Sequence, residues 1–223
     1  MKKKLIFILS LLMAAALMAS LSLSAFALED EGGFVGGQEA MASGEQDRTL
    51  FIAGETVGSE ARVKGIVLAA GNNVNVAGTG EYVMAAGRYV AVTGAVENDA
   101  FAAGYSVAVN GDVQRDAYAV GNDVTLNGSV GRSLYASAAS VVINGRVGGD
   151  AKLNADTIYI GSDAVIDGTL SYNSRASISF ADGSSVAGTE VYADTSAETP
   201  EAAEAPVPAT LLPSAKLMLA RLL

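Results

Sequence analysis

Aspartates and arginines recur at a fixed spacing through the middle of the chain. Positions seventeen residues apart hold Asp99, Asp116, Ser133 and Asp150, and the position just before them holds Arg115 and Arg132. A row of stacked carboxylates can form a calcium or sugar site, because carboxylate oxygens are ligands for hard cations. We favour the alternative that the aspartates form a solvated row at a bend, where their turn geometry suits them. The two arginines are interpreted in the same way.

Histidine and cysteine are absent from all 223 residues. Their absence removes the commonest general base, the commonest transition-metal ligand and any disulfide framework. The chain also lacks the glycine-rich P-loop motif that binds phosphate. Its net charge of −10 disfavours contact with the phosphate backbone of nucleic acids. We therefore expect a protein that is not an enzyme, has no catalytic residues, binds no cofactor or metal and has no nucleic-acid partner.

The first 27 residues have the composition of a secretory signal peptide. Three lysines precede a long apolar run that ends in Ala25-Phe26-Ala27, and small residues at Ala25 and Ala27 predict cleavage after Ala27. The alternative is an uncleaved membrane anchor, because the apolar run approaches the length of a span. Cleavage would remove three basic residues and no acidic ones, which lowers the net charge from −10 to −13. We expect export to the cell envelope or the extracellular space, with membrane association left open.

Composition divides the remaining chain into four parts. Residues 28–47 are acidic and glycine-rich and predict a flexible lead-in. Residues 48–192 are rich in Val, Ala, Gly and Asn and form the predicted domain. Residues 193–213 hold all four prolines among Ala and Glu and predict a linker, and residues 214–223 predict a short apolar helix.

The predicted domain is built on a seventeen-residue repeat. The stretch "DAFAAGYSVAVNGDVQR" at 99–115 is followed at once by "DAYAVGNDVTLNGSVGR" at 116–132. Each unit alternates apolar and other residues and then reaches Asn-Gly, a turn pair that tolerates positive φ. A unit of this length is one coil of a solenoid. We expect an all-β, single-stranded parallel β-helix of about seventeen residues per coil and roughly eight coils, with disordered tails.

Stacking of such coils predicts which side chains lie above one another. Two inward columns are expected to form the core: Val74, Val90, Val107, Val124, Val141 and Ile158, and Val76, Val92, Val109, Leu126, Ile143 and Ile160. Asn110, Asn127 and Asn144 are expected to form a ladder of side-chain amides at one corner. After residue 160 the period breaks, and residues 166–188 are expected to form irregular final coils.

An outward column of large apolar side chains accompanies the core. It contains Met84, Phe101, Tyr118 and Tyr135, and Lys152 ends it. Such a column can stabilise its own face, as cross-strand aromatic pairs do. It can also act as a stripe for lateral association or for sugar rings, because a contiguous exposed apolar patch usually has a use.

The repeats resemble the exported branch of the bactofilin-like, polymer-forming cytoskeletal family. The resemblance rests on "NDAFAAGYSVAVNGDV", "GNDVTLNGSV", "SVVINGRVGGD" and "IDGTLSYNSRASISFADGSSVAG", and it covers roughly residues 50–190. It implies a right-handed parallel β-helix that self-associates end to end into filaments without a nucleotide. The function expected is therefore a self-polymerising scaffold of the bacterial cell envelope.

The alternative function is a monomeric extracellular module that binds glycan or cell wall. For the scaffold, the expected partner is a second copy of the chain. A cell-wall or membrane-associated protein is a further partner that the C-terminal tail can reach.

Overall fold

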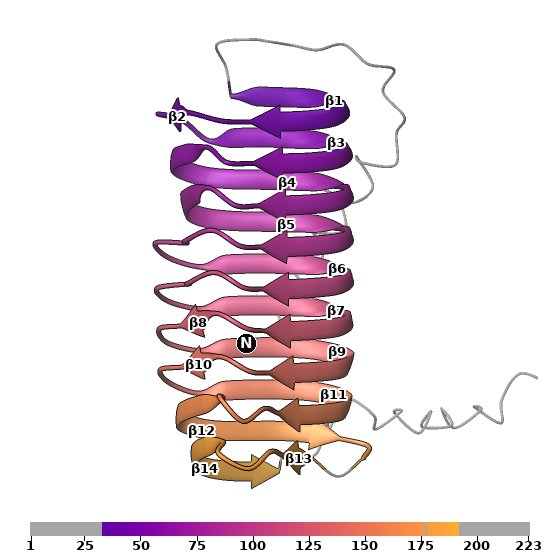
Figure 1. Ribbon diagram of the computed structural model, residues 1–223, viewed down its shortest axis with the longest axis vertical. Helices are drawn as coiled ribbons and strands as arrows, with labels where there is room; N and C mark the ends of the chain where they lie inside the picture. Colours follow the sequence, from indigo (N-terminus) through magenta and orange to yellow (C-terminus); the bar gives the residue numbers. More distant parts are fainter. Residues whose placement is uncertain (1–32, 177, 192–223) are drawn as a thin grey trace, which may run out of the picture. The chain divides into compact units, whose positions relative to one another are not determined.

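The computed structural model describes residues 33–176 and 178–191, and these form one parallel β-solenoid (Figure 1). The coils follow one another about seventeen residues apart, for about nine turns. The strands are β1 Phe34–Ala42, β2 Glu45–Gln46, β3 Leu50–Ser59, β4 Arg62–Val76, β5 Thr79–Val92, β6 Ala100–Val109, β7 Ala117–Leu126, β8 Ser129–Val130, β9 Leu134–Ile143, β10 Arg146–Val147, β11 Ala151–Ile160, β12 Val165–Ser174, β13 Ser179–Phe180 and β14 Ser185–Val191. The predicted signal peptide, linker and C-terminal helix lie outside the described residues.

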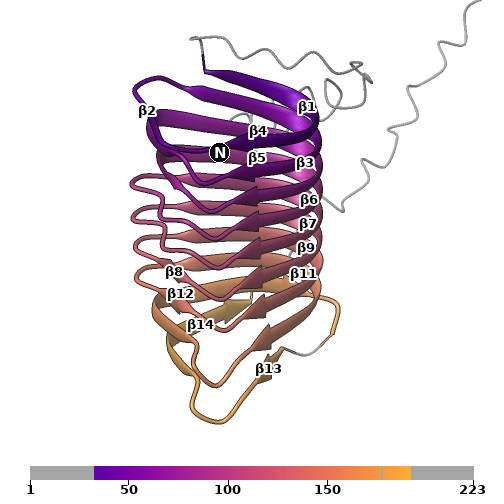
Figure 2. The same ribbon diagram turned by 45° about the horizontal axis from the view of Figure 1, so that its top comes forward.

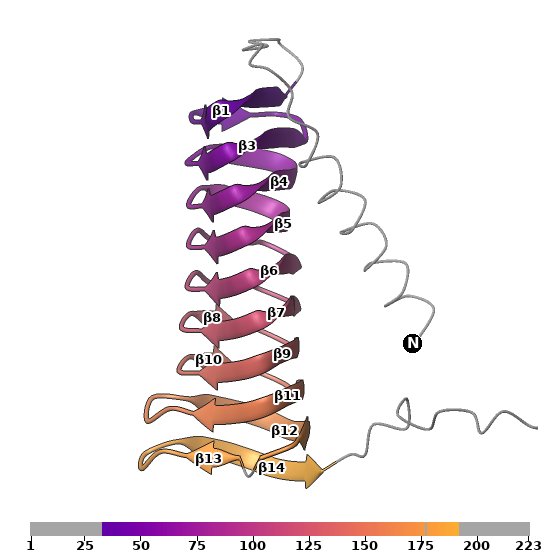
Figure 3. The same ribbon diagram turned by 90° about the vertical axis from the view of Figure 1, so that its right-hand side faces the viewer.

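One coil illustrates how the sequence makes the fold. In β6, Ala100, Ala102, Val107 and Val109 are buried, and the residues between them point outward. The chain bends after Gly104, turns again at Asn110-Gly111, and then Val113 bridges to the coils on both sides. Each coil is thus a flattened loop, as the tilted and edge-on views show (Figures 2 and 3). Its apolar side chains lie inside.

The predicted core columns are confirmed. Val90 pairs with Val107 and Val107 with Val124 across successive strands, and all twelve predicted core residues are at most 3 % exposed. Burying such a side chain contributes roughly 1.5–3 kcal/mol, whereas ordering each backbone residue costs about 1–2 kcal/mol. A single coil would leave its apolar edge in water, so the coils are stable only as a stack.

The predicted N-terminal boundary of the solenoid is wrong. Residues 28–47 were expected to be a flexible lead-in, but within this range β1 and β2 add a further coil. β1 pairs with β3 in the regular register, Phe34 with Phe51 and Val35 with Ile52. The glycines and acidic residues of this segment hide the periodicity when it is viewed alone, yet its apolar residues stand seventeen positions before their partners.

Glycine is required in the Asn-Gly turns for a different reason from the positive φ that the sequence predicts. None of Gly111, Gly128 and Gly145 has a positive φ. Instead, a Cβ atom added at any of them would lie about 2 Å from a carbonyl oxygen of the coil below. These glycines are required because the stacked turns approach one another closely.

The final coils are irregular, as the broken period predicted. β13 pairs with β11, whereas β14 pairs with β12 and shifts register between Ile166 and Thr169. Core columns that are buried elsewhere are exposed to solvent in these coils. Phe180 is 44 % exposed and Val191 is 70 % exposed.

Candidate interaction surfaces

The aspartate column joins successive coils through the backbone. A carboxylate oxygen of Asp99 accepts a hydrogen bond from the backbone N–H of Asp116 at 3.1 Å, and Asp116 accepts one from Ser133 at 3.1 Å. Asp150 likewise accepts from the backbone N–H of Thr169 at 2.9 Å. Each carboxylate therefore holds the equivalent position of the next coil.

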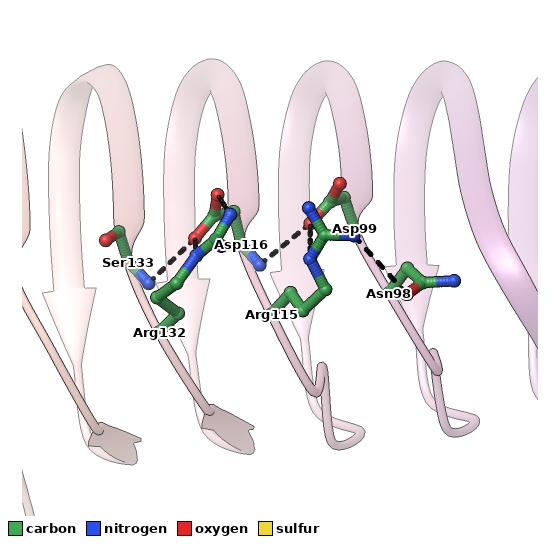
Figure 4. Close-up of polar contacts among 6 residues, drawn as sticks. All are labelled: Asn98, Asp99, Arg115, Asp116, Arg132 and Ser133. Atoms are coloured by element: carbon green, nitrogen blue, oxygen red, sulfur yellow. Dashed lines mark hydrogen bonds and ion pairs between the residues drawn. The ribbon is translucent and has the colours of Figure 1, made fainter.

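Arg115 and Arg132 form ion pairs with the first two aspartates of this column, Asp99 and Asp116 (Figure 4). Arg132 donates from Nε to Asp116 Oδ1 at 2.7 Å and from Nη2 to Oδ2, a two-point contact. Arg115 Nε lies 3.5 Å from Asp99 Oδ1, and its Nη1 lies 3.5 Å from the side-chain oxygen of Asn98. The interpretation of a solvated row is therefore wrong for Asp116, which is only 7 % exposed.

Electrostatics at Asp116 follow from these contacts. The hydrogen bond from Arg132 lowers the pKa of the Asp116 carboxyl below its ordinary value, and burial opposes that effect without overcoming it. The same pair raises the pKa of Arg132. The Asp116 carboxylate therefore links its own coil to the next one through Arg132 and Ser133, and we call this set of contacts the Asp116–Arg132 clasp.

No group of three or more potential metal-ligating side chains occurs within 33–176 or 178–191.

The predicted amide ladder is confirmed. Asn127 Nδ2 donates to Asn110 Oδ1 at 2.7 Å, and Asn144 Nδ2 donates to Asn127 Oδ1 at 2.8 Å. Both bonds run the same way along the solenoid, so Asn127 both donates and accepts. This corner is a structural row whose bonds join three successive coils.

The aromatic column is longer than the sequence analysis predicted. Met84, Phe101, Tyr118 and Tyr135 lie in register on β5, β6, β7 and β9, and Lys152 of β11 follows. Three further members precede them in the same register: Phe34, Phe51 and Leu68. We call these seven residues the aromatic column. A strict seventeen-residue step back from Met84 reaches Val67 and misses them, because the step from Leu68 to Met84 is sixteen residues.

The rings of the aromatic column are stacked face to face. Phe101 and Tyr118 have ring centroids 4.7 Å apart at 4°, and Tyr118 and Tyr135 have centroids 4.9 Å apart at 5°. Phe34 and Phe51 stack in the same way, 4.7 Å apart at 10°. The ring faces are therefore occupied by neighbours along the column, and burial raises the pKa of the Tyr118 hydroxyl. Between stacked neighbours only the ring edges remain for an external partner, whereas Phe34, at the N-terminal end of the column, is 55 % exposed.

A shallow depression of about 280 Å³ lies on the other flat side of the solenoid. It is lined by hydroxyl, amide and apolar groups, including Thr56, Asn73, Asn75, Tyr89 and Ser106. Its lining contains no carboxylate or basic side chain, so it brings together none of the acid–base pairs that hydrolytic chemistry uses.

The two ends of the solenoid expose parts of the core. At the N-terminal end Val35 is only partly buried against the core, and at the C-terminal end Ile178 and Val186 are partly buried in the same way. Within the described residues β1 pairs only with β3 and β14 only with β12. Each end therefore combines an unpaired strand edge with apolar side chains.

Comparison with protein-family models, with curated proteins and with solved structures finds no match to this chain. No helix long and apolar enough to cross a bilayer occurs in the part of the chain that the structure describes.

Proposed function

We propose that the protein is a non-catalytic scaffold of the cell envelope that polymerises by end-to-end stacking of its solenoids, without a nucleotide. The observation that carries this proposal is the pair of open ends. A strand edge with unpaired N–H and C=O groups is a template for another strand, and the partly exposed core residues add apolar area to the contact.

The same physics that stacks coils within one chain would join two chains. A new junction would continue the parallel ladder with strands about 4.8 Å apart and bury residues such as Val35 and Val186 against a second core. Joining one end to the other end of the next chain is a heterologous contact that does not close on itself, so it produces fibres.

Sequence features support the location and the partner. The signal peptide predicted for residues 1–27 favours export, and the acidic composition favours solubility of a secreted polymer. The partner in this proposal is a second copy of the chain, and a cell-wall or membrane-associated protein is proposed for the C-terminal tail.

Electron microscopy of the purified chain tests polymerisation, with light scattering as the concentration-dependent readout. We expect filaments, and we expect Val35→Glu to shorten or abolish them, because it places a charge in the open cross-section of the first coil. Met41→Glu is the matched control, since Met41 lies on the same strand but points outward and is 61 % exposed. Monomers of the unaltered chain at all concentrations would refute the proposal.

The alternative, a glycan-binding module, gains no support from the aromatic column. Sugar rings stack on the faces of aromatic side chains, and here those faces are occupied by the neighbouring rings. Retention of a stable monomer on peptidoglycan or polysaccharide would revive it.

A further inference from the structure

A second outward column runs beside the aromatic column on the same flat side of the solenoid. Its members lie two residues after those of the aromatic column and are Gly36, Ala53, Ala70, Ala86, Ala103, Val120 and Ser137. We call them the small-residue column. Ala86 is the least accessible of the alanines, at 6 % exposed. The two columns together form a ridge of large side chains beside a trough of small ones.

This apolar surface stops abruptly along the solenoid axis. In β11 the two columns continue as Lys152 and Asn154, and in β12 as Ser171 and Asn173. In β14 the aromatic column position is Glu190. The ridge and trough are thus confined to the first seven coils, which shows that coil stacking itself does not require apolar residues at these outward positions.

We propose that this face binds the same face of a second copy, with the ridge of each copy seated in the trough of the other and the two solenoid axes running in the same direction. The inference rests on the proposed function, because it places two filaments side by side. Two flat sheets pack face to face about 10 Å apart through interdigitating side chains.

Size complementarity sets the direction. Rotation by a half-turn about an axis parallel to the solenoid exchanges the two columns, so the large residues of one copy meet the small residues of the other. The opposite arrangement, with antiparallel axes, would bring ridge onto ridge and leave gaps over the alanines. Close packing favours the first arrangement, because gaps lose dispersion contacts.

The area of the face makes pairing dependent on polymer length. Seven coils at about 4.8 Å and two columns spanning about 13 Å give on the order of 400 Å² per copy. A stable interface between two proteins buries about 800 Å² per partner. One pair of chains would therefore associate weakly, whereas two filaments repeat the contact at every subunit and gain avidity.

Charge sets the expected dependence on salt. The chain carries a net charge of −10, so neighbouring filaments repel one another. Salt screens this repulsion and leaves apolar contacts in place, so paired filaments should become more frequent as ionic strength rises.

The first test uses two alanines of strand β6 that point to opposite flat sides. Ala103 lies in the small-residue column and Ala108 lies on the other side, and both are half-buried. We expect Ala103→Glu to reduce the fraction of paired filaments at least about tenfold without changing filament length, and Ala108→Glu to change neither. Length reports end-to-end joining and width reports lateral pairing, so failure of the proposed function and failure of this inference give different images.

The second test uses cysteine pairs, which is possible because the chain has no cysteine of its own. The aromatic column has Met84 in its middle coil, with Ala86 beside it in the small-residue column. Mixed filaments of Met84→Cys chains and Ala86→Cys chains should be cross-linked by a short dithiol-reactive reagent, because the proposed arrangement places these two positions opposite each other across faces about 10 Å apart, beyond the reach of a disulfide. Met84→Cys alone should not be cross-linked by this reagent.

Three results would overturn the inference. Filaments that remain single at every ionic strength would remove the lateral contact. Cross-linking of Met84→Cys alone would replace the proposed arrangement by the antiparallel one. The third result is a Met84→Cys thiol that does not react with a maleimide in single filaments. It would mean that another segment of the same chain covers this face.

Discussion

At the scale of single residues, Asp116 links three successive coils. Its backbone N–H donates to Asp99, and its carboxylate accepts from the backbone of Ser133 and from Arg132. Charged hydrogen bonds of this kind are worth more than neutral ones, and a buried carboxylate without its partners is costly. The clasp therefore stabilises the polar side of the solenoid while the valine columns stabilise its interior.

Asp116→Asn should lower the free energy of unfolding by about 1–3 kcal/mol. The amide keeps an acceptor for Ser133, but it loses the charge that engages Arg132. Urea denaturation followed by circular dichroism measures the change. Asp47→Asn is the control, because Asp47 pairs with Lys64 at a fully solvated position and should show no measurable change.

The same clasp should weaken in acid. The folded-state pKa of Asp116 lies below its ordinary value of 3.8, so unfolding takes up a proton when the pH is low. The contribution of the ionised Asp116 to the free energy of unfolding is complete above the unfolded-state pKa and is lost as the pH falls through the folded-state pKa. The difference in urea midpoint between the unaltered chain and Asp116→Asn should shrink between about pH 6 and about pH 3. A constant difference would contradict the account.

Gly128→Ala tests the close approach of the turns. The added methyl group would lie 2.1 Å from the carbonyl oxygen of Gly111, so backbone must shift, and we expect a loss of more than about 2 kcal/mol in the free energy of unfolding. Gly188→Ala is the control, since its nearest neighbour would be 3.9 Å away. Thermal unfolding compares the two, and equal melting temperatures would show that the turns can separate without cost.

At the scale of the element, the unit is the coil, and the sequence predicts it best where the repeat is unbroken. The valine columns and the asparagine ladder follow directly from spacing, because a seventeen-residue step is one turn of the stack. The first coil is hard to predict because its glycines and glutamates mask three buried or half-buried apolar positions, Val35, Ala40 and Ala42. The Asp116–Arg132 clasp does not follow from the sequence. The spacing predicts which residues stack on one another, but it does not predict which neighbouring side chain Arg132 contacts.

Deletion of residues 100–116 should leave a folded solenoid that is one coil shorter. Asp99 would then precede Ala117, as Asp116 does now, and every column would close in register. Deletion of residues 100–108 should prevent correct folding, because it removes part of a coil and breaks every column that follows. Circular dichroism and cooperative urea unfolding distinguish the two. Comparable loss of structure in both variants would contradict the account of the coil as the repeating unit of the stack.

At the scale of the whole solenoid, the distribution of apolar side chains is uneven in two directions. Both ends leave core residues partly exposed, and one flat side carries the ridge and trough over its first seven coils. The ends account for the proposed growth of a filament, and the flat side accounts for the proposed pairing of filaments. The other flat side is more polar, with Thr56, Asn73 and Ser106 pointing outward, so pairing would join two filaments and leave their outer sides in water.

Diffraction from aligned filaments tests the central claim most directly, because end-to-end stacking places every strand perpendicular to the filament axis. The account predicts a strong reflection at about 4.8 Å along the filament axis, which Val35→Glu removes together with the filaments. A 4.8 Å reflection perpendicular to the filament axis would mean that the solenoids lie across the filament, and it would contradict end-to-end growth.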